Sequence, residues 1–269
     1  MPPSPRPATS SPSTLTWADL GHGVTLNENA WTEQARRVFS DDLIRLIADL
    51  HRELQPMRED LLADRRTRQA AYDAGDLPGY LPKDEHPEAH GDWQVAPLPD
   101  DLLQRRVEIT GPVSDPKMVI NMLSRNDNGD RADAAMLDFE DSMKPTWPNV
   151  MQGVENVRDA AEGTLTYTKP ASNGAPGKEY SLDPDDMPLL MVRIRGLHLD
   201  ESNLRVDGTP VSGALLDLAT VAYHSARTLM EQGKTPKYYV PKVEHYREAR
   251  WVNRLFEGIQ EALDIPVGT

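Results

Sequence analysis

The segment AAMLDFEDS, residues 134–142, and the segment LLMVRIRGLH, residues 189–198, decide the fold of this chain. Each is an apolar run, as expected of a buried parallel strand, that ends abruptly in charged side chains. Carboxylates at the end of one strand and arginines at the end of another can hold a cation and stabilise developing negative charge. The two segments therefore predict an α/β sheet whose strand ends support a metal-assisted reaction through an anionic intermediate.

Short apolar runs alternate with helical patterns after about residue 99, which is typical of an α/β domain. The predicted strands and helices are residues 107–110, 118–123, 134–139, 189–194, 215–232, 238–242 and about 249–263. An excursion hairpin is expected within residues 165–182, and a turn is expected at Asp207-Gly208. A (β/α)8 barrel needs eight strand and helix units in about 250 residues. The four units here predict the first half of a TIM barrel, which continues beyond the chain.

The part of the chain before this pattern is predicted to be helical. Ser40 is the predicted N-cap of a helix with regular apolar periodicity, and Pro56 is predicted to end or kink it. A second helix is predicted over residues 58–74. Three of its arginines are interpreted as a solvated helix face in preference to an anion patch, and these are Arg65, Arg66 and Arg68.

Two stretches rich in proline divide the chain. Residues 1–14 also contain many serines and are predicted to be a disordered tail. Residues 75–99 combine proline, glycine and scattered charge, and they mark a domain boundary. The predicted organisation is therefore a tail at 1–14, an N-terminal helical domain at 15–98 and an incomplete barrel at 99–269.

Composition excludes several classes of protein. The formal net charge of −14 over 269 residues disfavours nucleic acid as a partner, because the phosphate backbone would repel such a surface. No apolar run approaches the ~20 residues needed to cross a bilayer, so no membrane partner is expected. The absence of cysteine excludes disulfides and thiolate ligands and fits a reducing compartment, with the cytoplasm as the expected location. A metal would be held by oxygen ligands, which favours Mg²⁺.

The charged ends of the two deciding segments supply the candidate site residues. Strand alternation predicts Asp138 and Glu140 on one side, with Phe139 and Asp141 on the other. Two carboxylates that face the same way repel each other unless a cation lies between them, so catalytic use and a salt-bridged strand end are equally supported. Arg193 and the arginine two positions later are predicted to share a face of their strand, and pairing with carboxylates is slightly favoured there.

Six motifs, taken together, resemble the N-terminal half of the malate synthase family, isoform A type, in order and spacing. They are RRVEITGPV at 105–113, KMVIN at 117–121, DFEDS at 138–142, PTW at 145–147, RIRGLHL at 193–199 and YVPK at 239–242. The resemblance runs from about Leu102 to Thr269 and is weaker over the N-terminal helices. It implies a TIM barrel with an N-terminal helical clasp, here residues 15–98, and a C-terminal helical plug.

The activity that the resemblance implies is an acyl transfer of the glyoxylate bypass. Acetyl-CoA is deprotonated, its enolate attacks glyoxylate in a Mg²⁺-dependent Claisen condensation, and hydrolysis of malyl-CoA gives malate and CoA. The partners implied are these small molecules. The residues that contact CoA are expected in later segments.

Motif matching also implies roles for individual residues. Arg193, the first arginine of the RIRG motif, matches the family's catalytic arginine. The implied role is physically reasonable, because an always charged guanidinium can donate to an enolate oxygen and to a carbonyl of glyoxylate. Asp138 and Glu140 match carboxylates beside the metal, in its water shell, that orient the arginine. Positional support or salt bridging is expected for the neighbouring residues Asp141, Arg195, His198 and Lys242. The family's two direct Mg²⁺ ligands and its catalytic aspartate are expected after Thr269, so this chain alone is expected to be inactive.

Two alternatives stay open at this point. An acyl-CoA lyase of the citrate lyase β-subunit kind uses a similar barrel, arginine and metal, although the N-terminal helices and the motif at 105–112 favour malate synthase. A truncated, non-catalytic homologue that binds a partner chain or CoA is the other alternative.

Overall fold

The computed structural model describes residues 15–171 and 176–269. The predicted tail at residues 1–14 lies outside the described residues, and so does the tip of the excursion hairpin at residues 172–175.

A four-stranded parallel sheet forms the centre of the molecule. Its strands lie in the order β10-β7-β4-β3, and their bounds are β3 Glu108–Pro112, β4 Ala134–Asp138, β7 Leu189–Arg193 and β10 Lys237–Tyr239. Each strand pairs with the next of the four along the chain, as in a segment of a parallel barrel. The expected α/β fold with a partial barrel is confirmed. At the carboxyl edge the register places Asp138 opposite Arg193, and Arg193 opposite Tyr239.

Helices follow each of these strands. They are α3 Pro116–Leu123, α4 Trp147–Glu162, α5 Gly213–Glu231 and α6 Tyr246–Ala262. Helix α4 was not predicted, although its sequence carries the usual signals of a proline in the first turn and a left-handed glycine, Gly163 with φ +73°, at the end. Trp147 fixes its start, because the indole donates to the carbonyl of Ala30 at 2.8 Å and stacks on Phe39.

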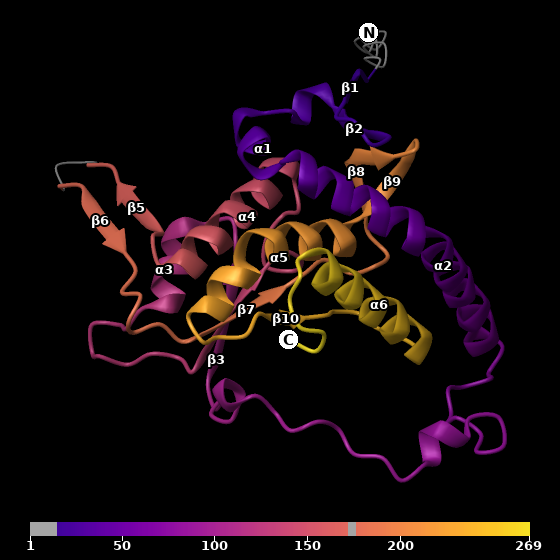
Figure 1. Cartoon of the computed structure of the whole chain (residues 1–269). Helices are drawn as coiled ribbons and strands as arrows, with labels where there is room; N and C mark the ends of the chain where they lie inside the picture. The colour runs from indigo at the N-terminus through magenta and orange to yellow at the C-terminus, as the bar shows by residue number, and fades with distance from the viewer. Residues whose placement is uncertain (1–14, 172–175) are drawn as a thin grey trace, which may run out of the picture.

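Helix α2, Asp41–Asp73, is one continuous element that contains Pro56. Ser40 caps it as predicted, since its hydroxyl accepts from the amide of Leu43 at 3.2 Å. The expected second helix after Pro56 is wrong, because apolar side chains on both sides of the proline are buried in one face, and this packing outweighs the lost hydrogen bond. In Figure 1 the violet α2 runs along α5 and α6, against which it packs.

A second, antiparallel sheet joins the N-terminal segment to a distant part of the chain. Its order is β1-β2-β8-β9, with bounds β1 Trp17–Asp19, β2 Val24–Asn27, β8 Asp200–Val206 and β9 Thr209–Ser212. The predicted turn at Asp207-Gly208 joins β8 to β9, and both residues have positive φ. Strands β1 and β2 were not predicted. Strand β1 pairs with β2, and the other partner of β2, strand β8, lies far along the chain.

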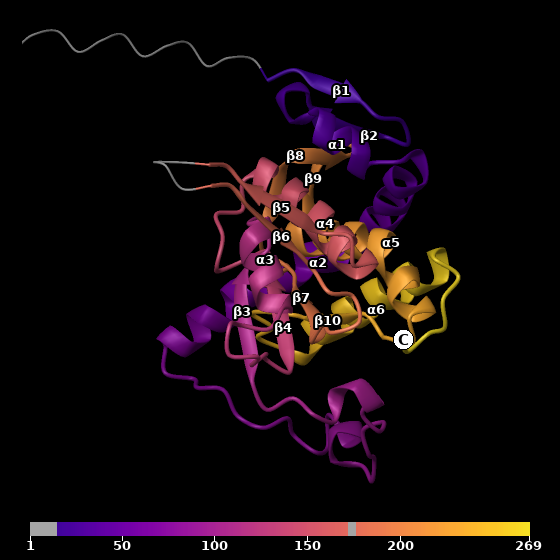
Figure 2. The same ribbon diagram turned by 90° about the vertical axis from the view of Figure 1, so that its left-hand side faces the viewer.

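The remaining elements are short. They are the 3-10 helices at Glu28–Ala30, Pro87–His90 and Asp100–Leu102, the helix α1 Glu33–Val38, and the hairpin of β5 Thr166–Lys169 with β6 Lys178–Ser181. The hairpin is the predicted excursion, and it lies beside α3 (Figure 2). Within the described residues no helix combines the length and the apolar character that crossing a bilayer requires.

Candidate functional site

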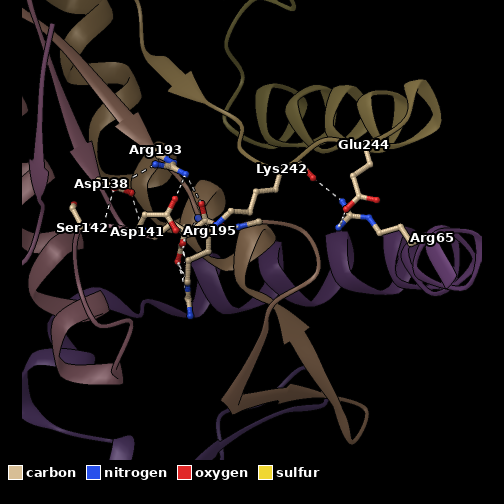
Figure 3. Close-up of polar contacts among 11 residues, drawn as sticks. Arg65, Asp138, Asp141, Ser142, Arg193, Arg195, Lys242 and Glu244 are labelled. Atoms are coloured by element: carbon tan, nitrogen blue, oxygen red, sulfur yellow. Dashed lines mark hydrogen bonds and ion pairs between the residues drawn. The ribbon is translucent and has the colours of Figure 1, made fainter. Parts of the chain in front are cut away.

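The candidate site lies where β4 and β7 end side by side. Arg193 is the last residue of β7, and Asp138, opposite it in the register, is the last residue of β4. Parallel strands bring their carboxyl ends to one edge of the sheet, which is where ligands bind in α/β proteins. The predicted meeting of a carboxylate strand end with an arginine strand end is confirmed, as Figure 3 shows.

The guanidinium of Arg193 is surrounded by three carboxylates. Its Nη2 donates to Glu140 Oε2 at 2.9 Å and to Asp141 Oδ2 at 2.5 Å, and its Nη1 lies 3.6 Å from Asp138 Oδ2. The ring of Tyr239 lies 5.8 Å from Cζ of the arginine. The Nε of Arg193 is buried and finds no acceptor among the residues that the structure describes. Because buried donors are normally satisfied, the guanidinium of Arg193 keeps hydrogen-bonding capacity that the described residues do not use.

Asp138 shapes the turn that follows β4. Its two carboxylate oxygens accept from the amides of Glu140 and Ser142 at 2.8 and 3.0 Å. The strand therefore ends at Asp138, and alternation does not continue beyond it. Phe139 is buried, and the predicted placement of Asp141 on the side away from Asp138 and Glu140 is wrong, since Asp141 binds Arg193 together with Glu140.

Lys242 completes the cluster from the loop after β10. Its Nζ lies 2.9 Å from Asp141 Oδ1 and 3.2 Å from Glu140 Oε1. Glu140 Oε1 also accepts from the amide of Gly196 at 3.2 Å. Hydrogen bonds from Lys242 and then from Arg193 lower the pKa of Asp141 below its usual range. These contacts fit the salt-bridging role that the resemblance implied for Asp141 and Lys242.

Arg195 does not belong to this cluster. It is buried, and its Nε and Nη2 donate to Asp217 while its Nη1 donates to Glu201 at 2.9 Å. Burial opposes its charge, but the carboxylates of Asp217 and Glu201 more than compensate and raise the pKa of Arg195. The predicted shared face with Arg193 is therefore wrong, because β7 ends at Arg193 and the chain turns.

His198 lies beside the cluster rather than in it. Its Nδ1 is buried and has no partner among the described residues. Burial and then the positive charge of Arg65 lower the pKa of His198, so the ring is neutral at pH 7. Its close approach to Gly196 leaves no space for a Cβ there, since His198 Cε1 lies 2.6 Å from where that atom would stand.

The charges of the cluster bear on metal binding. Three carboxylates, those of Asp138, Glu140 and Asp141, face two cations, those of Arg193 and Lys242. The excess negative charge favours a further cation nearby. However, the part of the chain that the structure describes contains no group of three or more His, Cys, Asp or Glu side chains arranged to hold a metal ion. The residues present do not make a ligand set by themselves.

Two domain families, both of malate synthase, match the chain. "Malate synthase, N-terminal domain" matches residues 27–86, and "Malate synthase, TIM barrel domain" matches residues 189–269. Among curated proteins, the malate synthase of Myxococcus xanthus is 43% identical over 93% of this chain and 44% of its own length. The glyoxysomal malate synthase of Candida tropicalis is 38% identical over 88% of the chain and 41% of its own length. Malate synthase A of Escherichia coli is 36% identical over 91% and 44%. The chain thus spans less than half the length of these relatives.

Proposed function

Because the chain belongs to the malate synthase family, of which it spans the N-terminal domain and part of the TIM barrel domain, we propose that the protein containing it makes malate from acetyl-CoA and glyoxylate. A base removes a proton from the acetyl methyl group, and the resulting carbon attacks the aldehyde carbon of glyoxylate. The aldehyde oxygen takes up the negative charge and then a proton. Water finally cleaves the thioester, which releases malate and CoA.

Arg193 is the residue whose surroundings support this proposal most. Negative charge develops on the thioester oxygen of the enolate and on the former aldehyde oxygen, and preorganised donors stabilise such charge strongly. The guanidinium stands at the carboxyl edge of the sheet with its side chain 16% exposed, and its buried Nε has no acceptor among the described residues. We assign Arg193 as the catalytic group that donates hydrogen bonds to these oxygens.

Asp138 and Glu140 are proposed to hold Arg193 in position. Asp138 is itself fixed by two backbone amides, and Glu140 by the amide of Gly196. A charged donor whose partners are fixed in this way needs little reorganisation when the reaction begins. Their proposed contribution is therefore orientation of the guanidinium.

The malate synthase family generally uses Mg²⁺, which when bound would act as a Lewis acid on glyoxylate oxygens. The described residues do not supply its ligand set, and the carboxylates that are present already pair with Arg193 and Lys242. We derive no step through the metal. The direct ligands and the catalytic base are proposed to lie in the part of the family fold that follows Thr269.

No observation favours the citrate lyase alternative, since both matching families and the three relatives described above are malate synthases. The cytoplasm is the proposed location, although the Candida tropicalis relative is glyoxysomal by name. Fluorescence of a tagged full-length protein would test the location.

The experiment that tests this function measures CoA release from acetyl-CoA, glyoxylate and Mg²⁺ by the full-length protein. Arg193→Lys is expected to lower kcat by about 10²–10³, because an ammonium cannot reproduce the planar set of donors. Arg45→Lys is the matched control, since that exposed arginine pairs with Asp42 on α2 and is expected to keep normal activity. Turnover that survives Arg193→Lys unchanged would contradict the assignment.

The chain of residues 1–269 by itself is expected to release no CoA under the same conditions. It would lack the base and the metal ligands that the proposal places after Thr269. Turnover by this chain that depends on Arg193 would show that its own residues suffice, and would also exclude the non-catalytic alternative.

A further inference from the structure

Arg65 of helix α2 reaches the loop that carries Lys242. Its Nη2 donates to the backbone carbonyl of Lys242 at 2.7 Å, and its Nη1 lies 3.1 Å from Glu244 Oε1 (Figure 3). Its Nε donates to Glu248 Oε1 at 2.8 Å. The side chain is 14% exposed. The expectation of a solvated face is therefore wrong for Arg65, which joins the N-terminal helix to the loop between β10 and α6.

Glu248 binds both Arg65 and the backbone of the loop. Its side chain is fully buried, and it accepts from Arg65 Nη2 as well as Nε, and from the amide of Glu244 at 2.8 Å. Burial opposes its ionisation, but the hydrogen bonds from Arg65 and from that amide hold the pKa of Glu248 below its ordinary value. The carboxylate is thus charged at pH 7 and holds both Arg65 and the loop.

The backbone of Lys242 adopts a conformation that lysine rarely takes. Its φ is +55°, in the left-handed region, which is unfavourable for a residue with a Cβ. The bond from Arg65 to the carbonyl of Lys242 stabilises this turn. With the backbone in this conformation, the ammonium of Lys242 lies against Asp141 and Glu140, which flank Arg193.

We propose that Arg65 is a positioning residue of the reaction, which acts through Lys242 on the carboxylates that hold Arg193. The inference rests on the proposed function, and it assigns to helix α2 a part in the site that it does not itself line. Loss of Arg65 would release the left-handed turn, withdraw the ammonium from Asp141 and Glu140, and let Arg193 leave its reactive orientation. Small displacements of this kind lower the rate of the chemical step.

A double-mutant cycle in the full-length protein tests the route through Lys242. Arg65→Met and Lys242→Met are each expected to lower kcat by about tenfold and to leave the KM for acetyl-CoA unchanged. The double variant is expected to match Lys242→Met within about twofold, because Arg65 has no further effect once its target is gone. A double variant whose loss equals the product of the two single losses would overturn the proposal.

Arg68→Met is the matched control. Arg68 lies on the same helix and contacts Glu248 Oε1 at 3.4 Å, so it shares the ion pair with Arg65. Its described contacts do not include the carbonyl of Lys242, and kcat is expected to stay normal. A loss as large as that of Arg65→Met would indicate a general effect of the ion pair and would overturn the proposed route through Lys242. If Arg65→Met does not fold, Arg65→Lys keeps the charge beside Glu248 but cannot span all three acceptors, and it is expected to show the same coupling.

A second measurement does not depend on activity. Competitive labelling with a trace amount of an amine-reactive acetylating reagent measures how fast the Lys242 amine is acetylated. Peptide mass spectrometry compares this rate in the folded wild type and in Arg65→Met. The rate is expected to rise several-fold in the variant as the ammonium leaves its carboxylates, while that of the exposed Lys144 stays constant. An unchanged rate at Lys242 would overturn the inference. Absence of turnover in the wild type would instead refute the proposed function, and the labelling result would still decide the role of Arg65.

Discussion

Arg193 and Arg195 are two residues apart, and each lies among carboxylates, yet their surroundings differ. The side chain of Arg195 is 3% exposed, and its donors are taken up by the buried carboxylates of Asp217 and Glu201. That of Arg193 is 16% exposed, its partner Asp141 is 54% exposed, and its Nε has no acceptor among the described residues.

The difference separates a structural ion pair from a candidate catalytic one. A closed set of charges in which every donor is satisfied stabilises one arrangement of the chain but offers no group to a ligand. An incompletely satisfied set at the edge of a sheet keeps a donor for the reaction, at some cost in stability. The two arginines can therefore be told apart by their partners, although one is the last residue of β7 and the other lies only two positions later.

Among substitutions that test this comparison, Arg195→Met is expected to change the free energy of unfolding most. Removing the arginine leaves Asp217 and Glu201 buried without a partner charge, which is expected to lower the free energy of unfolding by about 3–5 kcal/mol. Arg193→Met is expected to cost only about 1 kcal/mol, because Lys242 still pairs with Glu140 and Asp141, and two backbone amides still bind Asp138. Urea denaturation of the full-length protein, followed by circular dichroism, measures both. Equal losses would mean that the two clusters do not differ in the way described.

The smallest effect is expected from Asp141→Asn. Since hydrogen bonds from Lys242 and Arg193 lower the pKa of Asp141 in the folded protein, its stabilising contribution is present above the ordinary aspartate pKa and disappears as the pH falls through the lower, folded value. The urea midpoint of the variant is therefore expected to lie slightly below that of the wild type at pH 7, and the gap is expected to close as the pH falls below the ordinary aspartate range. A gap that widens towards acid pH would contradict the sign of this shift.

Much of the sheet and the centre of the site could be predicted from local sequence. The apolar runs that end in charge located β4 and β7, and adjacent parallel strands necessarily brought Asp138 and Arg193 together. Alternation failed at Asp141, because the side chain of Asp138 binds two amides of the next turn and ends the strand. These bonds span only two and four positions, and aspartate often binds the amide two residues on, so Asp138 was itself the local signal that the strand could end there.

Long-range partners account for the other differences. The position of the Arg195 side chain depends on Asp217, which lies in α5. The position of the Arg65 side chain depends on Glu248, which is more than 180 positions away. Helix periodicity describes which residues share a face, but it does not say whether another element covers that face. Continuation of α2 through Pro56 has the same origin, since the burial that outweighs the proline comes from tertiary packing.

The pairing of β2 with β8 has a consequence for synthesis of the protein on the ribosome. Val24 lies opposite Val206, so one strand is made long before its partner. At about 5–20 residues per second, roughly ten to forty seconds pass between the two. During that time the edge of β2 is unpaired and open to other strands, which is when a nascent chain is most exposed to misassociation and most in need of a chaperone.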